Sequence, residues 1–191
     1  MNAGEWAGRE LGTRVIDYTE RDAILYALAV GASADRLDLV FEDRLRVLPT
    51  FGLTLAQWAP DVLSEAGAFD NTAVHGAQEL VVHGALPRSG SIELSARVGD
   101  VFDKGSAAIF EVIVDCEQFT ATWTLFAPGV GGFGGDRGPS RAAPIERGDA
   151  SILSLETAPT QAALYRLTGD RHHIHIDAAA SARSGRAVPS R

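Results

Sequence analysis

The sequence of 191 residues contains little that would place the protein on nucleic acid or at a membrane. Acidic residues outnumber basic residues by 25 to 17, which gives a formal net charge of −8, whereas binding to a phosphate backbone needs Lys and Arg clustered on one face. No apolar run approaches the roughly 20 residues of a membrane span. The N-terminus, MNAGE, lacks the basic start and apolar core of a signal peptide. We therefore expect a cytoplasmic protein whose partners include neither nucleic acid nor a membrane.

Cysteine is almost absent, and the single Cys116 excludes an internal disulfide. It continues a strand-like run over 107–115, where a buried, inert thiol is the commoner interpretation. A composition of 46% hydrophobic and 22% charged residues excludes a disordered tail or a fibrous stalk. The most frequent domain size is about 100–150 residues. The length therefore indicates one complete domain and a further piece.

A capped helix is predicted between Asp17 and Gly31. Thr19 stands at the N-cap, Asp22 follows three residues later, and Gly31 provides the stop. Residues 47–52 indicate extended structure or a turn, because Pro49 restricts the preceding residue and Gly52 interrupts the pattern. A less regular region is expected from there to about residue 72.

Strand-type apolar runs separated by short turn sequences follow this region. They cover residues 80–86, 92–98, 107–114 and 119–126. Consecutive strands with short turns favour an antiparallel meander, and the preceding helix needs a sheet to cover. The sequence therefore predicts the α+β fold class.

The composition changes to Gly, Pro, Arg and Asp between residues 128 and 160, with a strand-like run over 151–155. Such a change is typical of a crossing between two domains. We place the boundary near Pro144, with one unit over residues 1–143 and a second over 144–191. A helix-like run over 161–168 lies in the second unit. That unit is too short to bury a core of its own, so we expect it to be incomplete.

The run from Gly129 to Gly134 satisfies the pattern G-x-G-x-x-G of a dinucleotide-binding loop. That loop requires a helix that begins at its last glycine, so that the helix N-terminus lies under the pyrophosphate. Residues 135–139 read GDRGP, which breaks a helix. The context therefore disfavours a dinucleotide site.

A polar cluster from Asp170 to Asp177, with the sequence DRHHIHID, leaves three interpretations open. In a strand, His173, His175 and Asp177 would share a face and could bind a divalent transition metal. In a surface loop, the same side chains would be solvated. In a cleft, Asp170 and His175 could exchange protons with a substrate without any metal.

The surrounding string, AALYRLTGDRHHIHID over residues 162–177, resembles the hydratase 2 motif Y-R-L-S-G-D-x-N-P-L-H-I-D. This motif belongs to the R-specific 2-enoyl-CoA hydratases of the MaoC-like family. Further segments resemble the same family in the same order. They are residues 18–28, 48–52, 75–78, 86–90, 103–106 and 131–135.

The resemblance implies a double hot-dog fold, with a complete N-terminal hot dog that helps to hold an acyl-CoA and an incomplete, catalytic second hot dog. It implies reversible hydration of a trans-2-enoyl-CoA to a (3R)-3-hydroxyacyl-CoA in fatty-acyl metabolism such as β-oxidation. Asp170 and His175 would be the catalytic acid and base, without a metal or other cofactor. We expect a homodimer or a complex with a partner chain.

The sequence departs from the family pattern in three places. His172 and His173 replace the Asn and Pro of the motif, and Ala77 stands where the family often has Glu. The chain ends where the family continues into the helix that supplies a donor to the thioester oxygen, so we expect a truncated catalytic half. The alternative function is a non-catalytic acyl-CoA-binding or subunit-type hot-dog protein.

Overall fold

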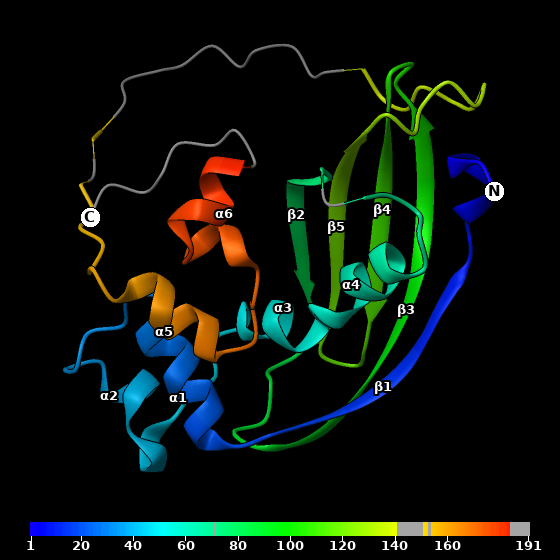
Figure 1. Ribbon diagram of the computed structural model, residues 1–191. Coiled ribbons are helices and arrows are strands. Elements are labelled where there is room, and N and C mark those ends of the chain that lie inside the picture. Colours follow the sequence, from blue (N-terminus) through cyan, green and yellow to red (C-terminus); the bar gives the residue numbers. More distant parts are fainter. Residues whose placement is uncertain (71, 141–150, 153, 184–191) are drawn as a thin grey trace.

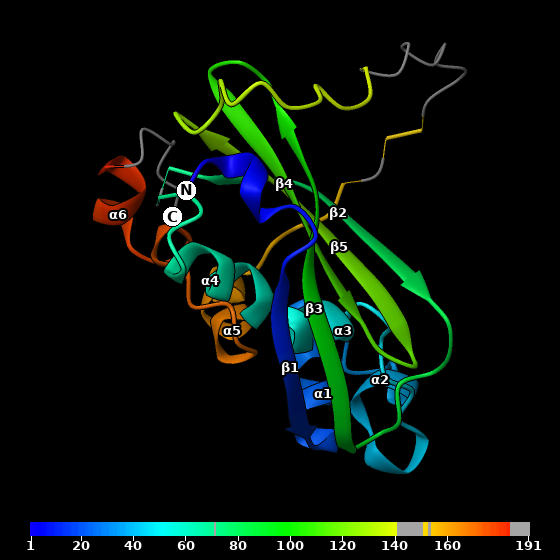
Figure 2. The same cartoon turned by 90° about the vertical axis from the view of Figure 1, so that its right-hand side faces the viewer.

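The computed structural model describes residues 1–70, 72–140, 151–152 and 154–183. Its centre is a five-stranded antiparallel sheet that curves around two short helices (Figures 1 and 2). In spatial order the strands are β1 (Glu10–Tyr18), β3 (Gly90–Asp103), β4 (Ala107–Asp115), β5 (Phe119–Pro128) and β2 (Val74–Val82). The predicted antiparallel meander is confirmed for β3–β4–β5, but its first step is wrong, because β2 pairs with β5 and not with β3.

In the chain, some helical segments come before β2 and the others come after β5. The α-helices are α1 (Glu20–Ala29), α2 (Leu37–Val40), α3 (Phe51–Ala56), α4 (Trp58–Glu65), α5 (Gln161–Leu167) and α6 (Ala178–Arg183). The 3-10 helices are η1 (Ala3–Trp6), η2 (Glu42–Arg44) and η3 (His173–His175). None of the helices in the described part of the chain is both long and apolar enough to cross a membrane.

The two edge strands differ most from the sequence prediction. Strand β1 was not predicted. Strand β2 begins at Val74 and ends at Val82, whereas the predicted run covered residues 80–86, so Leu86 lies beyond its end. Both strands pair on one side only, and their apolar alternation is therefore weaker than that of β3, β4 and β5. Each also contains a register shift, between Glu10 and Gly12 in β1 and between His75 and Ala77 in β2.

The central strands bury every second residue on one face. In β4, for example, Ala108, Phe110, Val112 and Val114 are fully buried, while the residues between them are half-buried. This alternation follows from the two-residue period of a strand. One apolar face of the sheet therefore has to be covered by another element.

Helices α3 and α4 cover that face, and this corrects the expectation of an irregular region. The region predicted to be irregular up to residue 72 contains both helices, with Phe51, Leu55, Ala59 and Leu63 buried at helical i, i+4 spacing. Pro60 does not break α4, because it lies in the first helical turn, where its missing N–H has no intrahelical partner to lose.

The predicted capped helix is confirmed as α1, but it does not lie across the sheet. The backbone N–H and the hydroxyl of Thr19 both donate to the carboxylate of Asp22, at 2.9 and 2.6 Å. Helix α1 packs against α2, α3 and α5 at one end of the sheet (Figure 1). It therefore serves as a platform for α5 rather than as the cover of the sheet.

The glycine-rich run over 129–134 has a structural role in the described residues. The buried carboxylate of Asp103, at the end of β3, accepts the backbone N–H groups of Gly105, Gly132 and Gly134 at 2.7–2.8 Å. A Cβ atom on Gly131 would lie 2.3 Å from the carbonyl oxygen of Ala107. In the described residues 135–140 no helix begins, as the sequence GDRGP predicts.

The remaining expectations concern Cys116 and the crossing segment. Cys116 follows β4 in the turn to β5 and is half-buried, and its backbone N–H donates to Phe119. The proposed boundary near Pro144 lies outside the described residues. Within the run 151–155, the described residues form no strand, and the side chain of Ile152 is 96% exposed.

The Asp103 hydrogen bonds predict a specific acid sensitivity. They hold the pKa of Asp103 at about 2, below its ordinary value of 3.8. This group therefore stabilises the fold above about pH 4, and the contribution is lost as the pH falls towards 2. Asp103→Asn should lower the thermal unfolding midpoint at neutral pH and flatten its fall between pH 4 and 2, as measured by circular dichroism. Asp100→Asn, at an exposed position of β3, is the control and should change neither.

Candidate functional site

The motif segment is fixed to the N-terminal part of the chain through α5. This helix confirms the helix-like run predicted over 161–168 and packs on α1 (Figure 1). The side-chain amide of Gln161 donates to the carbonyl of Ala29 at the end of α1. The rings of Tyr165 and Tyr26 lie 6.3 Å apart, centroid to centroid. The position of the motif is therefore set by contacts with α1.

A tight turn after α5 presents Asp170. Gly169 has φ +133°, a conformation that residues with a side chain rarely adopt. The guanidinium of Arg166 donates to the carbonyl of Arg171 at 2.6 Å and closes the turn. The backbone N–H of His172 then donates to the Asp170 carboxylate at 3.0 Å. These bonds fix the direction of the chain as it enters η3.

Two cavities meet at this turn. The first, here called the α5 cavity, has a volume of about 850 Å³ and lies beside α5 and the end of α1. The second, here called the sheet cavity, has a volume of about 750 Å³ and lies between α4 and strands β2 and β5. The residues that border both are Asp170, His172 and His175.

The structure thus places the two predicted catalytic residues, Asp170 and His175, at the same two cavities. Asp170 is half-buried and His175 is exposed. The rings of His175 and His172 are 5.9 Å apart, centroid to centroid. A carboxylate and an imidazole that face a common space are able to exchange protons with a molecule held there.

The metal interpretation of the cluster required a strand, and the structure has a 3-10 helix over His173–His175 instead. His173, His175 and Asp177 therefore do not share a face by the two-residue period. In the described ranges, no group of three or more His, Cys, Asp or Glu side chains could hold a metal ion.

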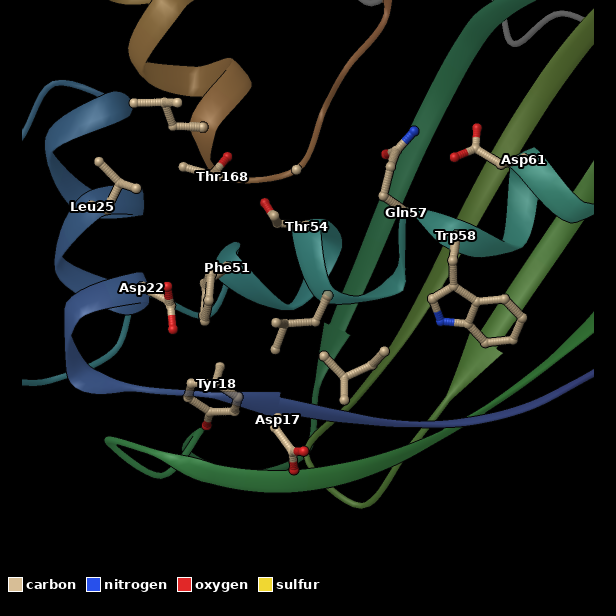
Figure 3. Close-up of a pocket in the computed structure, with 14 residues that line it drawn as sticks. Asp17, Tyr18, Asp22, Leu25, Phe51, Thr54, Gln57, Trp58, Asp61 and Thr168 are labelled. Atoms are coloured by element: carbon tan, nitrogen blue, oxygen red, sulfur yellow. The ribbon is translucent and has the colours of Figure 1, made fainter.

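A third cavity, here called the α1 cavity, has a volume of about 360 Å³ (Figure 3). In Figure 3, Thr168 of the motif segment lies above Thr54 of α3, and Asp61 comes from α4 beside Trp58. Asp61 borders the sheet cavity as well, and so does Gln57, at the break between α3 and α4. The break in the helical cover thus lies where the two cavities approach each other.

Asp61 is the site residue that the sequence prediction missed. Its side chain is exposed, yet the surrounding chain partly desolvates the carboxyl and raises its pKa. Glu65 and Asp170 raise this pKa further, while His172 and Arg14 lower it. The apolar i, i+4 spacing in 51–63 was the available signal, because it identifies a helix. The proximity of Asp61 to the motif could not be read from the sequence.

Strand β2 carries the block in which Ala77 replaces the Glu that is frequent in the family. The ring nitrogen Nε2 of His75 lies 3.0 Å from the carbonyl oxygen of Ala77, and Gln78 donates to the carbonyl of Thr122 on β5. His75 also borders the sheet cavity. The block therefore adjoins the candidate site but offers no carboxylate at residue 77.

Comparison with known proteins identifies the family. Residues 16–128 match the model of the MFE-2 hydratase 2 N-terminal domain. Enoyl-CoA hydratase ChsH3 of Mycobacterium tuberculosis is 35% identical over 93% of this chain and 68% of its own length. The peroxisomal multifunctional enzyme type 2 of Mus musculus is 35% identical over 89% of this chain and 26% of its own length. The chain belongs to the MaoC-like hydratase 2 family.

Further comparisons agree on the fold and on the extent of the match. The probable enoyl-CoA hydratase 2 of Dictyostelium discoideum is 34% identical over 90% of this chain and 64% of its own length. A MaoC-like dehydratase from Phytophthora capsici has a TM-score of 0.80 at 23% identity, over 97% of this chain and 70% of that one. The sheet and its covering helices are therefore a hot-dog fold. The chain spans about two thirds of ChsH3 and of the Dictyostelium relative, and about a quarter of the mouse enzyme.

The contact of Tyr165 with Tyr26 predicts how firmly the motif is held. Tyr165→Ala removes an aromatic pair that contributes about 1 kcal/mol beyond its buried area. We expect amide hydrogen exchange in α5 to become about fivefold faster or more, which corresponds to that free energy. Tyr165→Phe keeps the ring and should have a smaller effect. Equal protection of α5 in the wild type and in Tyr165→Ala would show that the ring contact does not hold the helix.

Proposed function

We propose that this protein hydrates trans-2-enoyl-CoA reversibly to (3R)-3-hydroxyacyl-CoA. The observation that carries the proposal is the position of Asp170 and His175, which border the same two cavities in a segment that matches the hydratase 2 motif. Membership of the hydratase 2 family supports it. The names of relatives such as ChsH3 describe enoyl-CoA hydratases, and the proposal extends that activity to this chain.

Asp170 and His175 are proposed to bind one water molecule between them. As the water oxygen attacks C3, one of the two groups takes a proton from the water and the other delivers a proton to C2. The C2=C3 double bond is consumed, and new C3–OH and C2–H bonds form on the same face. The thioester oxygen becomes more negative during the step, so a hydrogen-bond donor has to face it.

The two units predicted from the sequence are assigned different roles in this reaction. We propose that residues 1–143 help to hold the acyl group and that residues 144–191 are the start of the catalytic hot dog. The sheet cavity supports the first role, because Phe69, Trp123 and Leu125 of this unit give it apolar walls beside the polar motif residues. A homodimer or a partner chain is proposed as the working assembly.

The second candidate function is binding of an acyl-CoA without catalysis. Ala77 favours it, because this residue of β2 can supply no carboxylate beside His75, which borders the sheet cavity. The replacement of the motif Asn and Pro by His172 and His173 points in the same direction. The two candidates differ in turnover and not in ligand.

Substitution of the predicted pair separates the candidates. Asp170→Asn and His175→Ala should each reduce the hydration of crotonyl-CoA, followed as loss of enoyl absorbance, by about 10²- to 10⁴-fold. Binding of the CoA ester, measured by calorimetry, should change little, because both groups act on the transition state. Equal loss of binding and turnover would count against catalytic roles for Asp170 and His175.

The same assay is best run on two versions of the protein, since the chain spans about two thirds of ChsH3. One is the chain itself, and the other carries the C-terminal helix and strands of a family member. Turnover by the chain itself supports the hydratase proposal directly. Turnover by the extended version alone supports acyl-CoA binding as the role of this chain.

A further inference from the structure

Arg166 is the charged residue of α5 that reaches the turn at the site. It borders the α5 cavity together with Asp170, His172 and His175. Its Nη1 donates to the backbone carbonyl of Arg171 at 2.6 Å, five residues further along the chain. The guanidinium therefore joins the end of α5 to the segment that lies between the proposed acid and base.

The peptide group that Arg166 holds also carries the donor to Asp170. The carbonyl of Arg171 and the N–H of His172 belong to one planar trans peptide group, in which the oxygen and the hydrogen point in opposite directions. The oxygen accepts from Arg166, and the N–H donates to Oδ1 of Asp170 at 3.0 Å. One rigid unit thus connects the guanidinium to the carboxylate, and this chain of two hydrogen bonds is here called the peptide link.

The positive charge of Arg166 also strengthens the second bond of the peptide link. Hydrogen bonds in a chain polarise one another, and a bond from an ionised donor is stronger than a bond between neutral groups. The guanidinium draws electron density towards the oxygen of Arg171, so the amide hydrogen of His172 becomes a better donor to Asp170. A rotation of the peptide group would break both bonds together. The peptide link therefore restricts the direction of the carboxylate.

Contacts other than the guanidinium end α5 and hold it in place. The hydroxyl and the backbone N–H of Thr168 donate to the carbonyl of Tyr165 at 2.7 and 3.0 Å, and the N–H of Gly169 donates to the backbone carbonyl of Arg166 at 3.3 Å. Gln161 and Tyr165 fix the helix to α1. The side chain of Arg166 takes part in none of these contacts. Its hydrogen bond therefore acts on the turn and not on the helix.

We propose that Arg166 is a positioning residue of the site: through the peptide link it fixes Oδ1 of Asp170 in a hydrogen bond to the backbone and leaves Oδ2 to the reacting water. This role rests on the proposed hydratase function, whereas the peptide link itself rests on the two hydrogen bonds. Arg166 contacts neither the water nor the substrate in this role. Its removal should therefore slow turnover without weakening the binding of the substrate.

Exchange of the His172 amide proton with water, measured by nuclear magnetic resonance, tests the peptide link without any activity. Arg166→Ala should speed this exchange about fivefold or more, as expected for the loss of a charge-assisted bond near the surface. Arg171→Ala is the matched control, because it removes an equal charge from an exposed side chain beside Asp170 and keeps the backbone carbonyl. It should change the exchange by less than about twofold.

Three outcomes of this measurement would overturn the peptide link. The first is an unchanged exchange rate of the His172 amide in Arg166→Ala. The second is an equal effect of Arg171→Ala, which would assign the change to charge alone. The third is a rise in exchange throughout α5 as large as that at His172, because it would show a general loosening of the helix.

Steady-state kinetics test the positioning role. For crotonyl-CoA hydration, Arg166→Ala should lower kcat about tenfold and change KM by less than about twofold, because a misdirected carboxylate affects the reacting water and not the bound ester. Guanidinium chloride at a non-denaturing concentration should restore part of kcat in Arg166→Ala, since the free cation can donate to the carbonyl of Arg171. It should restore nothing in Asp170→Asn. An absence of rescue, or a rise of KM in proportion to the loss of kcat, would overturn the positioning role.

The two experiments separate the inference from the proposed function. If the wild-type chain hydrates no enoyl-CoA, the proposed function fails for this chain, and the amide exchange alone decides whether the peptide link exists. If hydration occurs and the exchange of the His172 amide does not respond to Arg166→Ala, the hydratase proposal stands and the peptide link is refuted.

Discussion

Burial of one apolar face of the sheet is the constraint on which the rest of this structure depends. Strands β3, β4 and β5 place fully buried residues such as Leu94, Phe110 and Ala121 on the same face. A sheet with such a face is stable only when another apolar surface covers it. Helices α3 and α4 supply that surface, and Ala56, Ala59 and Leu63 are completely buried against it. The small side chains of Ala56 and Ala59 allow the helices to lie close to the strands.

The way in which this face is covered also creates the candidate site. The cover is two short helices with a break at Gln57, and Gln57 borders both the α1 cavity and the sheet cavity. Helix α1, which is not needed across the sheet, remains available as the platform for α5. The turn that follows α5 is thereby brought to the sheet cavity, which Asp61 of α4 also borders. The site is therefore a consequence of how the core is closed.

Family membership and activity rest on different observations. The match over residues 16–128 and the 35% identity to ChsH3 establish the family through the hot-dog part and much of the motif segment. The proposed chemistry depends on a few side chains around Asp170 and on the histidines at 172 and 173, where this chain departs from the motif. Fold similarity does not decide the function of such positions, because function depends on the residues of the site.

Local patterns were sufficient for part of the structure. The cap of α1 could be predicted because Thr19 and Asp22 are three residues apart. The central strands could be predicted because their apolar residues alternate with a period of two. The edge strand β1 could not, because an edge strand with one partner has weak alternation. The helices α3 and α4 were also missed, because Pro49 and Gly52 indicated extended structure or a turn.

The sequence by itself determined the α+β class, the meander, the helix α5 and the candidate pair Asp170 and His175, because each is encoded in residues that are close along the chain. Only the tertiary structure decided that α3 and α4, rather than α1, cover the sheet, and that the glycine run is bound to Asp103. It also decided that Asp61 faces the motif more than a hundred residues later. These features depend on contacts between distant segments, whose positions follow from packing the whole core and not from any local pattern.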